Sequence, residues 1–187
     1  MSPSQGAKER PVNILSGKKF DITIDRLCYQ LIENHNDLSN SALIGLQPRG
    51  ASLSAEIHRR LLKILKKEFL YGTLDITFHR DDFRQHEGPL LPSLMKLDFS
   101  IEDKKVILVD DVLYTGRTIR AGLEALLDFG RPDKVELLVL VDRRFSRQLP
   151  IDADYVGLTV DTRASQKVKV TWHDKDGENG IWLMEAS

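Results

Sequence analysis

The chain alternates between short apolar runs and segments in which apolar residues recur every three or four positions. One helix face is predicted over 24–32, where the apolar positions are Ile24, Leu27, Cys28, Leu31 and Ile32. A second helix is predicted over 53–65, because a leucine or isoleucine stands at every fourth position. Between them, the run SALIGL (41–46) predicts a strand. Over 74–79 apolar and polar residues alternate, which predicts a strand with one solvated face.

The second half of the chain continues this order. Residues 106–109 and 134–142 are apolar runs typical of strands that are covered on both faces. A helix is predicted between them, with a core stripe made of Ile119, Leu123, Leu126 and Leu127. Strand, helix and strand in this order predict an α/β fold, in which helices flank a mainly parallel central sheet. The segments KVKVTW (167–172) and IWLME (181–185) enclose a turn-rich stretch and predict a C-terminal hairpin.

Length and composition favour one soluble globular domain. The chain has 187 residues, of which 41% are hydrophobic and 29% charged. We assign residues 1–13 to a flexible N-terminal tail and residues 14–187 to the domain. Residues 80–103 show no periodicity, and an irregular stretch of this length is typical of a functional lid or a disordered segment.

Charge and cysteine content limit the setting. The net charge of −1 gives no reason to expect nucleic acid or an anionic membrane as a partner. Cys28 is the single cysteine, and its place in the helical stripe predicts a core residue rather than a reactive thiol. Without a signal-like start or a long apolar run, we expect a cytoplasmic protein with no membrane contact.

The candidate chemistry lies in VILVDDVLYTGRT, residues 106–118. Asp110 and Asp111 end the most apolar strand, and ligands of open parallel sheets bind beyond that end. Adjacent side chains on a strand point to opposite faces, so the two acids need not share one site. Thr115, Gly116 and Thr118 then open a helix, whose first amides form an anion cradle. Acids for a polyol beside amides for a phosphate suggest a sugar phosphate ligand.

Two other interpretations of this segment were weighed. The acids could belong to an ordinary strand-to-helix loop with Thr115 as the N-cap. A nucleotide-binding P-loop is set aside, because LYTGRT lacks the Gly-Lys-Ser/Thr ending on which that cradle depends.

Residues 106–118 resemble the phosphoribosyl pyrophosphate (PRPP) motif of type I phosphoribosyltransferases: an apolar strand, two acids, a few variable residues and Thr-Gly-x-Thr. The sequence VILVDDVLYTGRTIRAGLEALLDFGRP resembles one branch of these enzymes in particular, the PyrR family of bifunctional pyrimidine operon attenuation proteins and uracil phosphoribosyltransferases. Three further segments match the same family in the same order along the chain: QPRG (47–50), RDD (80–82) and LVDRRFSRQLPIDADYVG (140–157). The resemblance therefore runs from residue 14 to the end. It implies the type I phosphoribosyltransferase fold with a hood, and the formation of uridine monophosphate (UMP) and pyrophosphate from uracil and PRPP.

The resemblance also implies roles for individual residues. Arg49 and Gly50 would form the pyrophosphate loop, where such enzymes often have a non-proline cis peptide, and segment 140–157 would form the hood over uracil. Asp110 and Asp111 would bind the ribose hydroxyls and Mg²⁺, and together with Arg80 they are the catalytic candidates. The base contacts would be Val141, Asp142 and Arg143. The implied PRPP-binding set is Arg49, Gly50, Arg80, Asp81, Asp82, Asp110, Asp111, Val112, Leu113, Tyr114, Thr115, Gly116, Arg117 and Thr118.

Further implied properties are a homo-oligomer, dimer or tetramer, and binding of pyrimidine operon leader RNA through a basic face. The first helix instead offers Asp21, Asp25 and Tyr29, and Asp152 and Leu158 occupy positions that are basic in many relatives. Because RNA affinity depends on phosphate neutralisation, we expect weakened attenuation with retained transferase activity. A different basic patch could still form from Arg143, Arg144, Arg147, Arg163, Lys167 and Lys169.

Around residues 144–146 the hood segment is one residue longer than in relatives of the family, which affects the expected base contacts. Two competing functions stay open at this point. One is an RNA-binding regulator that uses PRPP or nucleotides as signals with little turnover. The other is a transferase for another base, such as hypoxanthine or orotate.

Overall fold

The computed structural model describes residues 11–77, 97–163 and 165–185, and it has the expected α/β architecture. Its central sheet has the strand order β3-β2-β4-β5-β6, and all neighbouring strands are parallel. The strands are β2 (Ser41–Gln47), β3 (Leu70–Asp75), β4 (Lys105–Leu113), β5 (Lys134–Arg144) and β6 (Tyr155–Asp161). The sequence had not predicted β6, which forms one edge of this sheet.

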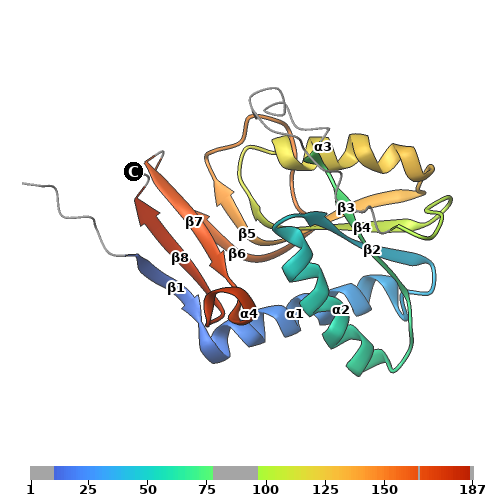
Figure 1. Cartoon of the computed structure of the whole chain (residues 1–187), viewed down its shortest axis with the longest axis horizontal. Helices are drawn as coiled ribbons and strands as arrows, with labels where there is room; N and C mark the ends of the chain where they lie inside the picture. The colour runs from blue at the N-terminus through green and yellow to red at the C-terminus, as the bar shows by residue number, and fades with distance from the viewer. Residues whose placement is uncertain (1–10, 78–96, 164, 186–187) are drawn as a thin grey trace, which may run out of the picture.

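Helices cover both faces of the central sheet. Helices α1 (Gly17–His35) and α2 (Gly50–Leu65) lie on one face, and α3 (Arg117–Leu126) lies on the other (Figure 1). Side chains of β4 alternate between two cores: Ile107 and Val109 pack with α1 and α2, whereas Val106 and Leu108 pack with α3. A strand that is covered in this way needs apolar residues at every position, which explains the continuous apolar run.

The predicted core stripe of α3 is only half right. Ile119 and Leu126 are buried, but Leu123 is 37% exposed and Leu127 is 66% exposed. The helix approaches the sheet through small residues instead: a Cβ atom at Gly122 would lie 2.9 Å from Cδ2 of Leu46. At this short distance Leu123 and Leu127 have no room between helix and sheet, and they lie on the outer side.

Strand β3 begins earlier than the alternating pattern predicted. It runs beside β2 from Leu70, paired with Ala42, to Asp75, paired with Gln47. The predicted solvated face is wrong at Asp75, which is 5% exposed and accepts hydrogen bonds from the backbone N–H and the hydroxyl of Thr77. The rest of the predicted strand, 78–79, lies outside the described residues.

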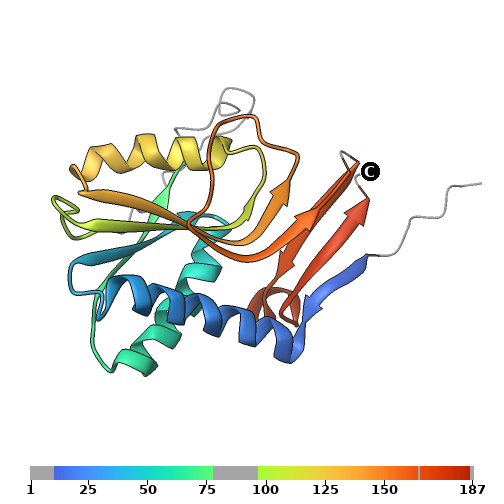
Figure 2. The ribbon, with the colours of Figure 1, turned by 180° about the vertical axis from the view of Figure 1, so that it is seen from behind.

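A second, antiparallel sheet has the order β1-β8-β7 and contains the predicted C-terminal hairpin. Its strands are β1 (Val12–Ser16), β7 (Gln166–Thr171) and β8 (Gly180–Glu185), and a short helix α4 (His173–Asp176) lies in the hairpin connection. Figures 1 and 2 show this sheet beside the central one, with β1 leading directly into α1. The first strand therefore includes Val12 and Asn13, which the sequence had assigned to the tail.

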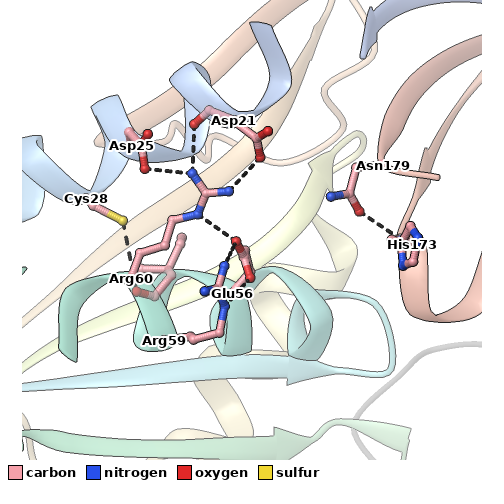
Figure 3. A network of polar contacts seen from close by, with 9 residues as sticks. Asp21, Asp25, Cys28, Glu56, Arg59, Arg60, His173 and Asn179 are labelled. Atoms are coloured by element: carbon pink, nitrogen blue, oxygen red, sulfur yellow. Dashed lines mark hydrogen bonds and ion pairs between the residues drawn. The ribbon is translucent and has the colours of Figure 1, made fainter. Parts of the chain in front are cut away.

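A group of ion pairs joins α1 to α2 (Figure 3). Arg60 of α2 contacts Asp21 at 2.7 Å, Asp25 at 2.6 Å and Glu56 at 2.6 Å. Cys28 beneath them is fully buried, as predicted, and burial raises the pKa of its thiol to about 12. Among the helices described, none combines the length and apolar character that a membrane span requires.

Candidate functional site

A cavity of about 520 Å³ lies beyond the carboxyl ends of β2, β4 and β5, against the hairpin strands β7 and β8. This is the edge of an open parallel sheet at which ligands bind. The cavity is lined by Gln47, Pro48, Arg49, Asp110, Asp111, Val112, Tyr114, Thr118, Arg143, Lys167, Val168, Lys169 and Met184. It therefore brings together residues of the pyrophosphate loop, the acidic pair and the phosphate loop that the sequence singled out.

The two acids share this cavity, although they are neighbours on β4. Each is 5% exposed, and Oδ1 of Asp110 accepts a hydrogen bond from the backbone N–H of Asp111 at 2.9 Å. Burial raises the pKa of Asp110, and the adjacent charge of Asp111 raises it further. Burial also raises the pKa of Asp111, against the opposing effect of the Arg49 guanidinium. Such a pair favours a ligand that brings positive charge or hydroxyl donors.

The loop before α2 is held against β4 by a close backbone contact. A Cβ atom at Gly50 would lie 2.2 Å from the carbonyl oxygen of Val109, so only glycine permits this approach. The contact places Arg49 close enough to the two acids to influence both pKa values. The expected non-proline cis peptide is wrong here, because the cis bond of the loop is Gln47–Pro48.

The phosphate loop between β4 and α3 turns at Gly116, which has a φ of 91° and is the N-cap of α3. Thr115 is therefore not the N-cap, and the backbone N–H of Arg117 lies 3.4 Å from its hydroxyl. Loop residues 114–118 carry the first amides of α3, which have no acceptor within the helix. Thr118 lines the cavity, so this end of the helix faces the site.

Two residues that the sequence did not assign to the site hold the phosphate loop. Arg147 donates to the carbonyl oxygen of Tyr114 at 2.6 Å and forms an ion pair with Asp142. The backbone N–H of Gln148 donates to the carbonyl oxygen of Thr115 at 3.0 Å. No short motif reveals these contacts, because Arg147 binds backbone carbonyls more than 30 positions away in the chain.

The predicted base contacts separate in the structure. Val141 is fully buried in the core, and Asp142 is paired with Arg147, so only Arg143 lines the cavity. Its guanidinium lies 4.0 Å from the ring centre of Tyr114 and donates to the Thr162 hydroxyl at 3.1 Å. Arg143 itself is 4% exposed, and burial lowers its pKa.

Segment 140–157 is not a hood. It belongs to β5, β6 and the loop between them and contributes Arg143 to the cavity lining, whereas the hairpin contributes Lys167, Val168, Lys169 and Met184. The expectation failed because β5 and β6 pair in parallel and extend the central sheet.

The other predicted residues are divided. Val112 and Tyr114 line the cavity, Leu113 is buried in the core on the α3 side, and Arg117 donates to Gln148 at 2.8 Å. The proposed lid residues Arg80, Asp81 and Asp82 lie outside the described residues.

Comparison with known proteins gives a consistent result. A family model described as the phosphoribosyl transferase domain matches residues 12–174. The Bifunctional protein PyrR of Actinobacillus pleuropneumoniae serotype 5b is 43% identical over 174 residues, which are 92% of this chain and 96% of the relative. The Bifunctional protein PyrR of Elusimicrobium minutum is 44% identical over 172 residues, 91% and 95% of the two chains.

Among solved structures, a mutant hypoxanthine phosphoribosyltransferase from Trypanosoma cruzi in complex with IMP aligns with a TM-score of 0.71. The alignment covers 98% of this chain and 94% of that one at 16% identity, so it supports the fold alone.

Proposed function

The chain belongs to the phosphoribosyltransferase family, and on that basis we propose that it forms UMP and pyrophosphate from uracil and PRPP. The relatives at more than 40% identity are named bifunctional PyrR proteins, in agreement with the resemblance of residues 106–118. The observation that carries the proposal is the shared cavity, in which Arg49, the acidic pair and the start of α3 surround one space of about 520 Å³.

Each part of PRPP has a suitable group in this cavity. The amides of residues 114–118 suit the 5-phosphate, because first-turn amides and the helix dipole both favour an anion. Asp110 and Asp111 suit the ribose hydroxyls as hydrogen-bond acceptors. Arg49 suits the pyrophosphate, to which a guanidinium can donate two hydrogen bonds at once.

The reaction transfers a 5-phosphoribosyl group. N1 of uracil attacks the anomeric carbon, and the bond from that carbon to the pyrophosphate oxygen breaks. Pyrophosphate leaves with the bonding electron pair, and the N1 proton passes to solvent. Positive charge builds on the ribose and negative charge on the leaving group, so a preorganised cation such as Arg49 stabilises the change. Walls from β5 and the hairpin limit the access of water to the ribosyl centre.

Magnesium is the cofactor that the family resemblance implies, and the acidic pair fits it. In residues 11–77, 97–163 and 165–185 no three potential ligands cluster into a complete protein-made metal site. Mg²⁺ is commonly held by one or two carboxylates together with substrate phosphates and water, and Asp110 and Asp111 supply such a pair. A bound Mg²⁺ would neutralise charge on the pyrophosphate oxygens.

Three further parts of the proposal rest on the resemblance. Arg80, Asp81 and Asp82 take part in binding PRPP, the protein works in the cytoplasm, and it assembles as a dimer or tetramer.

Leader-RNA binding is a second candidate activity, since the relatives are named bifunctional. We propose that this activity is weakened. Arg60 binds Asp21 and Asp25, so the side of α1 that faces α2 carries acids that are already paired. Among the residues of the alternative basic patch, Arg143 is buried. Three others form ion pairs: Arg144 with Asp161, Arg147 with Asp142 and Lys169 with Asp176.

The deciding experiment measures pyrophosphate release from PRPP with uracil, hypoxanthine or orotate in the presence of Mg²⁺. The proposal expects pyrophosphate release with uracil and not with hypoxanthine or orotate. Release with another base would change the substrate, and no release with any base, together with tight leader-RNA binding, would favour the regulator without turnover.

A further inference from the structure

A second hollow, of about 240 Å³, adjoins the main cavity on the side of the pyrophosphate loop. Pro48, Arg49, Asp111 and Lys169 line both spaces. The remaining lining residues of the second hollow are Ser52, Val170, Trp172, Lys175 and Asp176. We propose that Lys169 and Lys175 of the hairpin bind the pyrophosphate group together with Arg49, which deepens the proposed function and rests on it.

Lys175 is positioned to act on this loop. It lies on α4, and its ammonium group donates a hydrogen bond to the hydroxyl of Ser52 at 2.9 Å. Ser52 belongs to the first turn of α2, two residues after Gly50. The C-terminal hairpin thus delivers a positive charge to the loop from a segment more than 120 residues away in the chain.

The turn that carries Lys175 is itself well fixed. The backbone N–H of His173 donates to Oδ1 of Asn179 at 2.8 Å (Figure 3), and the backbone N–H of Trp172 donates to Oδ2 of Asp176 at 3.0 Å. Trp172 packs edge-on against Phe20 at a ring separation of 5.6 Å. These contacts reduce the entropy that would be lost when Lys175 binds a ligand.

The charges of the hollow favour an anion with several negative charges. Arg49, Lys169 and Lys175 provide three cations, against the carboxyl groups of Asp111 and Asp176. Lys169 is paired with Asp176 at 3.2 Å, whereas Lys175 binds a neutral hydroxyl and has no carboxylate within ion-pair distance in the described part of the chain.

The location separates this anion from the 5-phosphate. Tyr114 and Thr118, at the start of α3, line the main cavity but not the second hollow. The hollow therefore matches the diphosphate end of PRPP. Lys175 lines the hollow but not the main cavity, so its loss should not affect the binding of ribose 5-phosphate.

The test measures the affinity of magnesium pyrophosphate and, separately, of ribose 5-phosphate by calorimetric titration of the full chain. Lys175→Gln and Lys169→Gln are each expected to weaken pyrophosphate about fivefold, since a hydrogen bond to a charged group on an exposed side chain is of that order. Lys175→Arg keeps the charge and should keep most of the affinity. Ribose 5-phosphate should bind Lys175→Gln and Lys175→Arg as tightly as the wild type.

Lys67→Gln is the matched control, because Lys67 is also an exposed lysine that pairs with an aspartate, Asp37, and it does not line the hollow. Its pyrophosphate affinity should equal that of the wild type. If Lys175→Gln and Lys169→Gln bind pyrophosphate as tightly as the wild type while UMP is still made, this inference is wrong and the proposed function stands. If the wild type binds neither ligand and makes no UMP, both are wrong.

Discussion

Replacing Gly50 by alanine tests how the fold places the pyrophosphate loop. The added Cβ atom would lie 2.2 Å from the carbonyl oxygen of Val109 and 3.0 Å from Cα of Asp110. An ordinary carbon–oxygen contact is about 3.3 Å or more, so the start of α2 must move by roughly 1 Å. Overpacking of this kind costs about 1–3 kcal/mol of unfolding free energy. A displacement of about 1 Å in a positioned group reduces the rate about a hundredfold.

The assay compares UMP formation with the free energy of unfolding in urea. Gly177→Ala is the control, because Gly177 has a φ of 85° and nothing within 4 Å of the new Cβ atom. This control should lose about 1 kcal/mol of stability through backbone strain and keep its full rate. Gly50→Ala should lose stability to a similar extent and also most of its turnover. A Gly50→Ala enzyme with wild-type turnover and wild-type KM for PRPP would refute this explanation of the loop.

Three other predictions concern stability, thiol reactivity and RNA. Arg60→Met should lower the free energy of unfolding by about 1–2 kcal/mol at neutral pH, with the half-exposed acids contributing little of it. Burial raises the pKa of Glu56, but hydrogen bonds from Arg59 and Arg60 outweigh it and the pKa is lowered. The stability that Glu56 gains from these bonds is present above its pKa in the unfolded chain and is lost as the pH falls through its pKa in the folded protein. Urea unfolding should therefore show that the difference in unfolding free energy between Arg60→Met and the wild type shrinks in acid. A difference that stays constant with pH would contradict the assignment. Cys28 should resist a thiol reagent at pH 8 until urea unfolds the chain, and equal reaction in the folded state would show that its thiol is accessible. Pyrimidine operon leader RNA, titrated at two salt concentrations, should bind weakly with a shallow salt dependence, and tight, steep and sequence-selective binding would overturn the RNA proposal.

The sequence predicted those elements whose residues are all buried or are bounded by a clear turn. The run before Asp110 is buried on both faces of the sheet, so its strand was evident from residue types alone. The terminal hairpin was evident from its turn. Strand β1 was not predicted, because Val12–Ser16 is short and its strand character depends on pairing with β8 at the other end of the chain.

Side-chain orientation was harder to predict from periodicity. Leu123 and Leu127 follow the helical stripe but lie outside, because α3 approaches the sheet through Gly122 and its small neighbours. In the site, the motif located Asp110 and the phosphate loop, but nothing local indicated that Arg147 holds that loop. Contacts to backbone carbonyls leave no pattern in the residue types of the partner segment.

The central claim is that the two acids at the end of β4 hold the ribose of PRPP while its leaving group departs. The most direct measurement is the rate of uracil-dependent UMP formation by the double variant Asp110→Asn and Asp111→Asn, with urea unfolding as the check on folding. Because preorganised groups of this kind are worth about a hundredfold to a thousandfold each, we expect the rate to fall at least about a thousandfold in a folded protein. A folded double variant that makes UMP at the wild-type rate would contradict the account.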